Sequence, residues 1–122
     1  MEINQLSVVV PVRNEEGNVA ILVGEIDSAL KHILHEIIYV DDGSTDNTYS
    51  QLKALQTQFP QLKIVRHAQS CGQSTAVRTG VKAALYAWVA TLDGDGQNDP
   101  ADIVSMVNLI KNFQQLSIRS YL

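Results

Sequence analysis

The sequence predicts an α/β protein with a mostly parallel sheet and helices on both of its faces. Short apolar runs rich in β-branched residues alternate with segments whose apolar residues recur every three or four positions. The strand-like runs are apolar at nearly every position, which is typical of strands buried on both faces of a sheet. These patterns together indicate a Rossmann-like arrangement. The chain has 122 residues, a length typical of one domain, and we assign 1–122 to a single domain.

Four apolar segments are predicted to be strands: LSVVVPV (6–12), EIIYVD (36–41), LKIVRH (62–67) and WVATLD (88–93). Residues that favour turns and helix caps follow several of them, such as DGSTDNT after the second. Because each strand is followed by a helical segment, successive strands are expected to run parallel.

Four segments carry a helical apolar stripe: Val19–Ile33, Tyr49–Phe59, Ala76–Ala87 and Pro100–Phe113. The third has a face of small residues that includes Ala76 and Gly80, which would let the helix approach the sheet closely. Asp99 is expected to cap the fourth helix, with Pro100 at its first position.

Composition excludes several classes of function. The formal charge is −4 and no basic cluster is present, which argues against nucleic-acid binding. Cys71 is the single cysteine, so no intrachain disulfide forms and a reducing compartment fits. The opening MEINQL lacks a signal-peptide pattern, and no apolar run approaches the roughly 20 residues of a membrane span. We therefore expect a cytoplasmic location.

Acidic residues follow three of the predicted strands: Glu15, Asp41 and Asp42, and Asp93 and Asp95. In a parallel sheet these strand ends share one edge, which is where ligands bind in open α/β folds. Like charges about 4 Å apart repel by roughly 4 kcal/mol at an effective dielectric near 20. A hard divalent cation with oxygen ligands would relieve that repulsion. The sequence thus predicts Mg²⁺ or Mn²⁺ bridging a diphosphate at this shared edge.

A calcium-binding loop is the main alternative for DGDGQNDPADIV. It matches an EF-hand at positions one, three and five, but Asn98 stands where glycine is required and Val104 where glutamate is required. The segment before it also predicts a strand, whereas an EF-hand needs a helix there. Asp46 and Asp99 are better explained as turn or capping residues.

Other motifs give weaker signals. The glycine fingerprint for dinucleotides and the Walker A phosphate loop are both absent. GQSTAVRTG (72–80) opens a helix whose amides could meet an anion, which makes Gln73 and Arg78 candidate ligand contacts, although an Arg on a helix is more often a surface residue. We assign no role to the histidines, because none has metal-ligand spacing, or to Cys71, because it has no second cysteine as a resolving partner.

Three segments in order, VVVPVRNEEGNV, IIYVDDGSTDNT and ATLDGDGQNDP, resemble the family 2 glycosyltransferases of GT-A fold. They are most similar to the branch with dolichol-phosphate mannose synthases and bacterial polyprenyl-phosphate glycosyltransferases. The resemblance spans residues 6 to about 113. It implies inverting, metal-dependent transfer from a nucleotide-diphosphate sugar, such as GDP-mannose or a UDP-sugar, to a polyprenyl-phosphate-type acceptor.

The resemblance also implies roles for individual residues. The nucleotide would be held by Pro11, Val12, Arg13 and Glu15, with Asp41 and Asp42 contacting the base and ribose. The metal and diphosphate would be held by Asp93 and Asp95, with Gln97 assisting at the metal and Gly94 leaving space for the diphosphate. A lipid-phosphate acceptor would place the enzyme at the inner face of a membrane.

The resemblance covers only the nucleotide-binding half of such an enzyme, and LSIRSYL does not continue it. We therefore expect a truncated chain that binds donor weakly, transfers little, and exposes the fourth strand to self-association into a homo-oligomer. One alternative is an inactive fragment that acts only in binding or self-association. Another is a receiver-type signalling domain, but its acid pair would follow the first strand.

Overall fold

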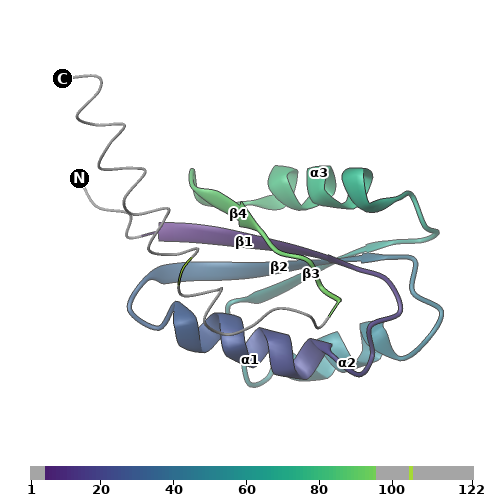
Figure 1. The fold of residues 1–122 in the computed structure, drawn as a ribbon, viewed down its shortest axis with the longest axis horizontal. Coiled ribbons are helices and arrows are strands. Elements are labelled where there is room, and N and C mark those ends of the chain that lie inside the picture. The colour runs from purple at the N-terminus through teal and green to yellow at the C-terminus, as the bar shows by residue number, and fades with distance from the viewer. Residues whose placement is uncertain (1–4, 96–104, 106–122) are drawn as a thin grey trace.

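The computed structural model describes residues 5–95 and residue 105, and its elements alternate between strand and helix (Figure 1). In chain order they are β1 (Gln5–Val12), α1 (Val19–Ala29), β2 (Leu34–Asp42), α2 (Thr48–Leu55), β3 (Leu62–His67), α3 (Gln73–Ala83) and β4 (Val89–Thr91). The predicted α/β class is confirmed. No helix within the described ranges is both long and apolar enough to cross a bilayer.

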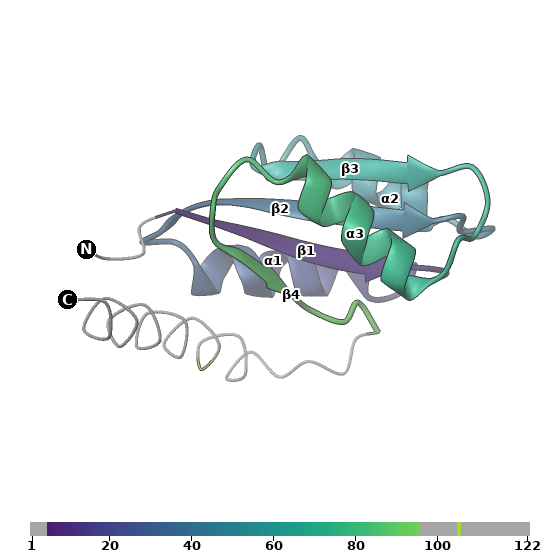
Figure 2. The same ribbon diagram turned by 90° about the horizontal axis from the view of Figure 1, so that it is seen from above.

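The four described strands form one sheet in the order β3-β2-β1-β4, and every neighbouring pair is parallel. In Figure 2 the strands lie side by side and β1 separates β2 from β4. The chain first builds the sheet outward from β1 to β3 and then returns to add β4 on the other side of β1. The carboxyl ends of β1 and β4 therefore flank the point where the strand order reverses, the usual ligand position in such sheets.

Helices cover both faces of the sheet, with α1 and α2 on one side and α3 on the other (Figure 1). Alternation along β1 sends Val8 and Val10 into the core under α1 and α2, whereas Val9 packs under α3. A Cβ atom on Gly80 would lie 2.3 Å from Cγ1 of Val9, so the absence of a side chain there lets α3 lie close to the sheet. The predicted small-residue face thus meets the sheet at Gly80.

The ends of three helices differ from the prediction. The first two stop at Ala29 and Leu55, before the predicted Ile33 and Phe59. The residues that follow still pack against the core through turns, as when the N–H of Ile33 donates to the Leu30 carbonyl at 2.8 Å. The apolar pattern therefore extends past the last helical hydrogen bonds, because the residues after each helix still pack on the core.

The third helix begins three residues earlier than predicted and ends at Ala83, not Ala87. The backbone of Ala84 is extended, which ends the helix. The next two amides donate to side chains: Leu85 N–H to Glu36 Oε2 at 2.5 Å, and Tyr86 N–H to Ser7 Oγ at 3.2 Å. The last strand spans only 89–91 within the predicted 88–93. The predicted helix 100–113 lies outside the described residues, apart from Ser105.

Candidate functional site

An open cavity of about 420 Å³ lies at the carboxyl edge of the sheet. The end of β1, the loop after it, the end of β2, the start of α3 and the loop after β4 all contribute to its wall. Its lining residues are Pro11, Val12, Arg13, Glu15, Asp42, Ser70, Gly72, Gln73, Ala76, Asp93, Gly94 and Asp95.

Most of the site residues predicted from the sequence line this cavity. They are Pro11, Val12, Arg13, Glu15, Asp42, Gln73, Asp93, Gly94 and Asp95. Asp41 and Arg78 are not part of the lining, and Gln97 lies outside the described residues. The parallel sheet therefore brings together acids that are separated by up to eighty residues of sequence, as the strand-end pattern predicted.

The loop after β4 reaches the cavity because it runs against β1. The N–H of Leu92 donates to the Val9 carbonyl at 3.0 Å. A Cβ atom on Gly94 would lie 2.3 Å from Val12 Cγ1 and 2.9 Å from the Pro11 carbonyl oxygen. Only glycine fits that approach, so Gly94 determines where the two flanking aspartates stand.

Gln73 connects this acidic loop to α3. Its Nε2 atom donates to Asp93 Oδ1 at 3.1 Å from the first residue of the helix. The side chains that line this end of the cavity thus include Asp93, Asp95 and a neutral amide that orients one of the two carboxylates.

Asp42 ends β2 and organises the loop before α3. Its Oδ1 accepts hydrogen bonds from His67 Nδ1 and from the N–H of Cys71, both at 2.8 Å. Its Oδ2 accepts from Ser70 Oγ at 2.9 Å and from the N–H of Gly72 at 3.0 Å. Burial disfavours the charged carboxylate, but these four donors outweigh burial and lower the pKa of Asp42 to about 2. Asp42 therefore stays ionised and holds the loop in place.

Gly43 lets that loop cross directly above the end of β2. It has φ of 71°, and a Cβ atom there would lie 2.5 Å from the Ser70 backbone nitrogen. Sequence reasoning missed the roles of Ser70, Gly72 and His67, because their partner Asp42 lies 25 to 30 residues away. Gly43, in the motif DDGS, is the residue whose position in the sequence could have indicated this close crossing.

Asp41 points to the opposite side of β2 from Asp42, as alternation along a strand requires. It is fully buried, and its Oδ1 accepts the N–H of Ser44 at 3.0 Å. Its Oδ2 lies 3.8 Å from Nε of Arg66, whose guanidinium stacks 4.2 Å from the centre of the Tyr49 ring. Asp41 thus shapes the turn after β2, and its predicted contact with the nucleotide stays a prediction, as does that of the exposed Arg78.

The turn after β2 in turn holds the loop after β1. Ser44 Oγ accepts the N–H of Asn14, and Thr48 Oγ1 accepts the N–H of Glu15, both at 2.9 Å. Asn14 has a positive φ of 55°, which aims its Oδ1 at the N–H of Thr45, 2.8 Å away. The DDGSTDNT segment therefore positions Arg13 and Glu15 at the cavity.

Asp46 has the structural role that the sequence favoured. Its Oδ1 accepts the Thr48 hydroxyl at 2.6 Å and the Thr48 N–H at 2.9 Å at the start of α2. The hydroxyl bond is the main reason that the pKa of Asp46 is lowered.

The family comparison decides what kind of protein carries this cavity. The glycosyl transferase family 2 model matches residues 7–118, which is nearly the whole chain. The chain belongs to glycosyl transferase family 2. The resemblance noted in the three strand-end segments is thereby confirmed.

Named relatives are glycosyltransferases as well. The chain is 43% identical over 107 residues to a dodecaprenyl-phosphate galacturonate synthase of Rhizobium johnstonii, covering 85% of the chain and 32% of the relative. It is 34% identical over 116 residues to a dolichol-phosphate mannosyltransferase of Pyrococcus furiosus, covering 95% of the chain and 33% of that relative. The chain thus spans about a third of the length of the curated relatives that it matches.

Among solved structures, the fold matches a mannosyltransferase of Pyrobaculum calidifontis in complex with GDP-Man and Mn²⁺. The TM-score is 0.68 at 26% identity, over 74% of this chain and 27% of that one. The parallel sheet with its helices is therefore the GT-A type of α/β fold, as predicted.

Proposed function

We propose that the cavity binds a nucleotide-diphosphate sugar together with Mg²⁺ or Mn²⁺ as the donor site of a glycosyltransferase. One observation carries the proposal: four carboxylates, those of Glu15, Asp42, Asp93 and Asp95, line a single cavity at the switch point of the sheet. An anionic donor enters such a site only with a cation. The solved mannosyltransferase complex with GDP-Man and Mn²⁺ supports this combination.

The residues present suit a hard divalent cation. Carboxylate oxygens are the ligands that Mg²⁺ and Mn²⁺ prefer, and we assign this role to Asp93 and Asp95. Gly94 has no side chain, so the loop that carries them lies against β1. A bound metal of this kind supplies charge neutralisation to a departing nucleoside diphosphate.

We assign separate roles in donor binding to the other lining residues. Pro11, Val12 and Ala76 offer apolar surface to a nucleoside, and Arg13 offers positive charge to a phosphate. Gln73 orients Asp93. Because all the oxygen lone pairs of Asp42 already face donors, this residue acts by shaping the wall of the cavity around the nucleotide.

The names of two relatives, a dodecaprenyl-phosphate galacturonate synthase and a dolichol-phosphate mannosyltransferase, support a lipid-phosphate acceptor. We infer inverting transfer to a polyprenyl-phosphate-type acceptor at the cytoplasmic face of a membrane, with this chain providing donor binding. An inactive form that acts only in binding or self-association is the alternative. Among the described strands β4 pairs only with β1, and this supports self-association through its outer edge.

Thermal unfolding with GDP or UDP, with and without Mn²⁺, separates these two functions. A ligand at about a hundred times its Kd adds roughly 2.7 kcal/mol to stability. For a chain of 122 residues this raises Tm by about 10 °C. The donor site predicts a shift that needs both nucleotide and metal. If neither nucleotide moves Tm when Mn²⁺ is present, the chain is no donor-binding unit.

Two variants locate the effect. Asp95→Asn removes a cavity carboxylate and should abolish the metal-dependent part of the shift. Glu16→Gln makes the same kind of change at an exposed carboxylate outside the cavity lining and should leave the shift intact. If Asp95→Asn keeps the full metal-dependent shift in Tm, the metal binds elsewhere. The assignment of the chain to the family would still hold.

A further inference from the structure

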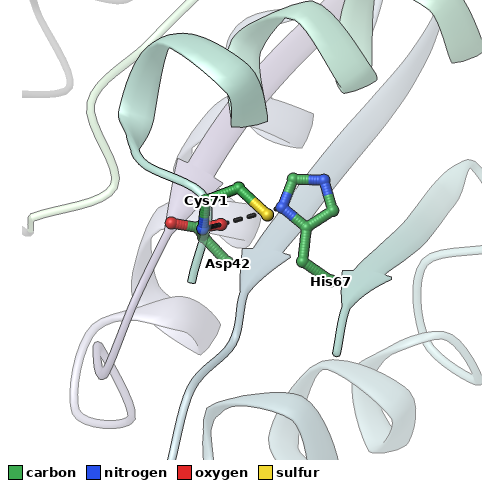
Figure 3. Close-up of side chains that lie close together, drawn as sticks. All are labelled: Asp42, His67 and Cys71. Carbon is green, nitrogen blue, oxygen red and sulfur yellow. Dashed lines mark hydrogen bonds and ion pairs between the residues drawn. The ribbon is translucent and has the colours of Figure 1, made fainter. Parts of the chain in front are cut away.

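A second set of metal-ligating side chains lies next to the cavity, formed by Asp42, His67 and Cys71 (Figure 3). Each offers one ligand atom, and these atoms lie within 4.8 Å of one another. The three residues come from the end of β2, the end of β3 and the loop before α3. Figure 3 shows the thiol, the imidazole and the carboxylate converging from these separate segments.

The chemistry of this set differs from that of the acidic loop. Asp93 and Asp95 offer oxygen atoms alone, which suit Mg²⁺ or Mn²⁺. A thiolate, an imidazole and a carboxylate together suit a softer cation, and zinc binds all three in proteins. The two sets would therefore select different metals at neighbouring positions.

Hydrogen bonds outside the set already orient the imidazole. His67 Nε2 lies 2.9 Å from Thr79 Oγ1, and the Thr79 hydroxyl donates to the Thr75 carbonyl at 3.0 Å. Thr79 Oγ1 can thus accept a hydrogen bond from Nε2–H. Nδ1 faces Asp42 and can bind a cation in place of the proton that it donates to Oδ1. A ligating histidine whose other nitrogen is held in this way is the usual arrangement at protein metal sites.

The carboxylate is oriented in the same manner. Ser70 Oγ and the N–H of Gly72 hold Asp42 Oδ2, and the N–H of Cys71 holds one lone pair of Oδ1. The other lone pair of Oδ1 faces His67 Nδ1 and becomes free for a cation when Nδ1 gives up its proton. The thiol is the adjustable member, because Cys71 is exposed and, within the part of the chain that the structure describes, its Sγ donates only to the Gln69 carbonyl, at 3.3 Å. Rotation of this side chain can move its sulfur without disturbing the fold.

We propose that Asp42, His67 and Cys71 bind a thiophilic divalent cation such as Zn²⁺, with water as the fourth ligand. Zinc bonds of about 2.0 Å to nitrogen and 2.3 Å to sulfur place neighbouring ligand atoms roughly 3.3–3.6 Å apart. The ligand atoms lie within 4.8 Å of one another, so the exposed thiol has to move inward by about 1 Å. His67 Nδ1 and Asp42 Oδ1, which are 2.8 Å apart, have to separate by roughly 0.5 Å. Binding releases the thiol proton and the Nδ1 proton of His67 to solvent.

Titration of the freshly reduced protein with Co²⁺, a spectroscopic substitute for Zn²⁺, tests this site in the absence of nucleotide. Because the sequence has one cysteine, a thiolate-to-cobalt charge-transfer band can arise only from Cys71. We expect saturable binding at one equivalent, a band that Zn²⁺ displaces, and loss of the band in Cys71→Ser. Thr79→Val should weaken binding by roughly 10–100-fold, since it removes the hydrogen bond that orients the ligand.

Two controls separate this site from other metal binding. His32→Gln changes an exposed histidine elsewhere, and Asp95→Asn changes the acidic loop, so both should keep the band and its affinity. His67→Gln should weaken binding severely while its circular dichroism spectrum stays that of the wild type. The proposal is overturned if the wild type gives no band, or if Cys71 binds cobalt equally well after His67→Gln or Thr79→Val. Because nucleotide is absent, its failure leaves the donor-site proposal untouched.

Discussion

Replacing Glu36 by Gln tests why α3 ends at Ala83. Glu36 is 3% exposed, and its Oε2 accepts from Ser7 Oγ at 2.6 Å and from the N–H of Leu85 at 2.5 Å. Its other oxygen contacts the Lys63 ammonium. Burial by itself disfavours the charged carboxylate, but Lys63, Ser7 and the Leu85 amide outweigh burial and lower the pKa of Glu36 below its ordinary 4.5. The charge is therefore stabilising in the folded protein.

The size of the expected stability loss follows from the contacts of Glu36 that Gln weakens or cannot make. With its amide oxygen in the place of Oε2, Gln keeps the bonds from Ser7 and Leu85 as a neutral acceptor, and its NH₂ group faces Lys63. Each kept bond weakens from about 1.5–3 to about 0.5–1.5 kcal/mol, which is a loss of about 1–1.5 kcal/mol per bond. The ion pair with Lys63, whose side chain is 48% exposed, adds less than about 1 kcal/mol. We expect Glu36→Gln to lower the free energy of unfolding by about 2–4 kcal/mol at pH 7.

Urea denaturation at pH 7 and pH 3, followed by circular dichroism, measures this loss. Because the pKa of Glu36 is lower in the folded state, its stabilisation is complete well above 4.5 and is lost as the pH falls through the folded-state pKa. The difference between wild type and variant should therefore narrow at pH 3. Glu25→Gln, a half-buried carboxylate on α1, is the matched control and should change stability by under about 0.5 kcal/mol. A Glu36→Gln difference that is unchanged at pH 3 would refute the reasoning.

Three glycine substitutions test the close approaches around the site. Gly94→Ala drives a Cβ atom into Val12 and should abolish the metal-dependent nucleotide shift in Tm while the far-ultraviolet spectrum stays native. Gly43→Ala combines a left-handed backbone with a collision against the loop before α3, and urea denaturation should show a loss of about 2–4 kcal/mol. Gly80→Leu overpacks the contact of α3 with Val9 and should cost about 1–3 kcal/mol in the same assay, so an unchanged midpoint would contradict the packing described.

The sequence alone determined the class of the fold, the order of its elements and the edge at which the site lies. Hydrophobic period and β-branched content are local properties, so they could be read without knowing the partners of each segment. Because parallel strands end at one edge, the positions of Glu15, Asp42 and Asp93 after three strands sufficed to predict that they meet. The family motifs lie on those same turns, and residues 7–118 match the family.

Only the tertiary structure decided which neighbouring residue faces the cavity and where α3 stops. Asp41 and Asp42 are chemically identical, yet one lies beside Arg66 and the other lines the cavity, because successive side chains of a strand point to opposite faces. The end of α3 depends on Glu36, a carboxylate 49 residues earlier in the chain that takes the Leu85 amide. Such contacts join segments that are remote in sequence, and their energy depends on burial and geometry that exist only once the sheet has formed.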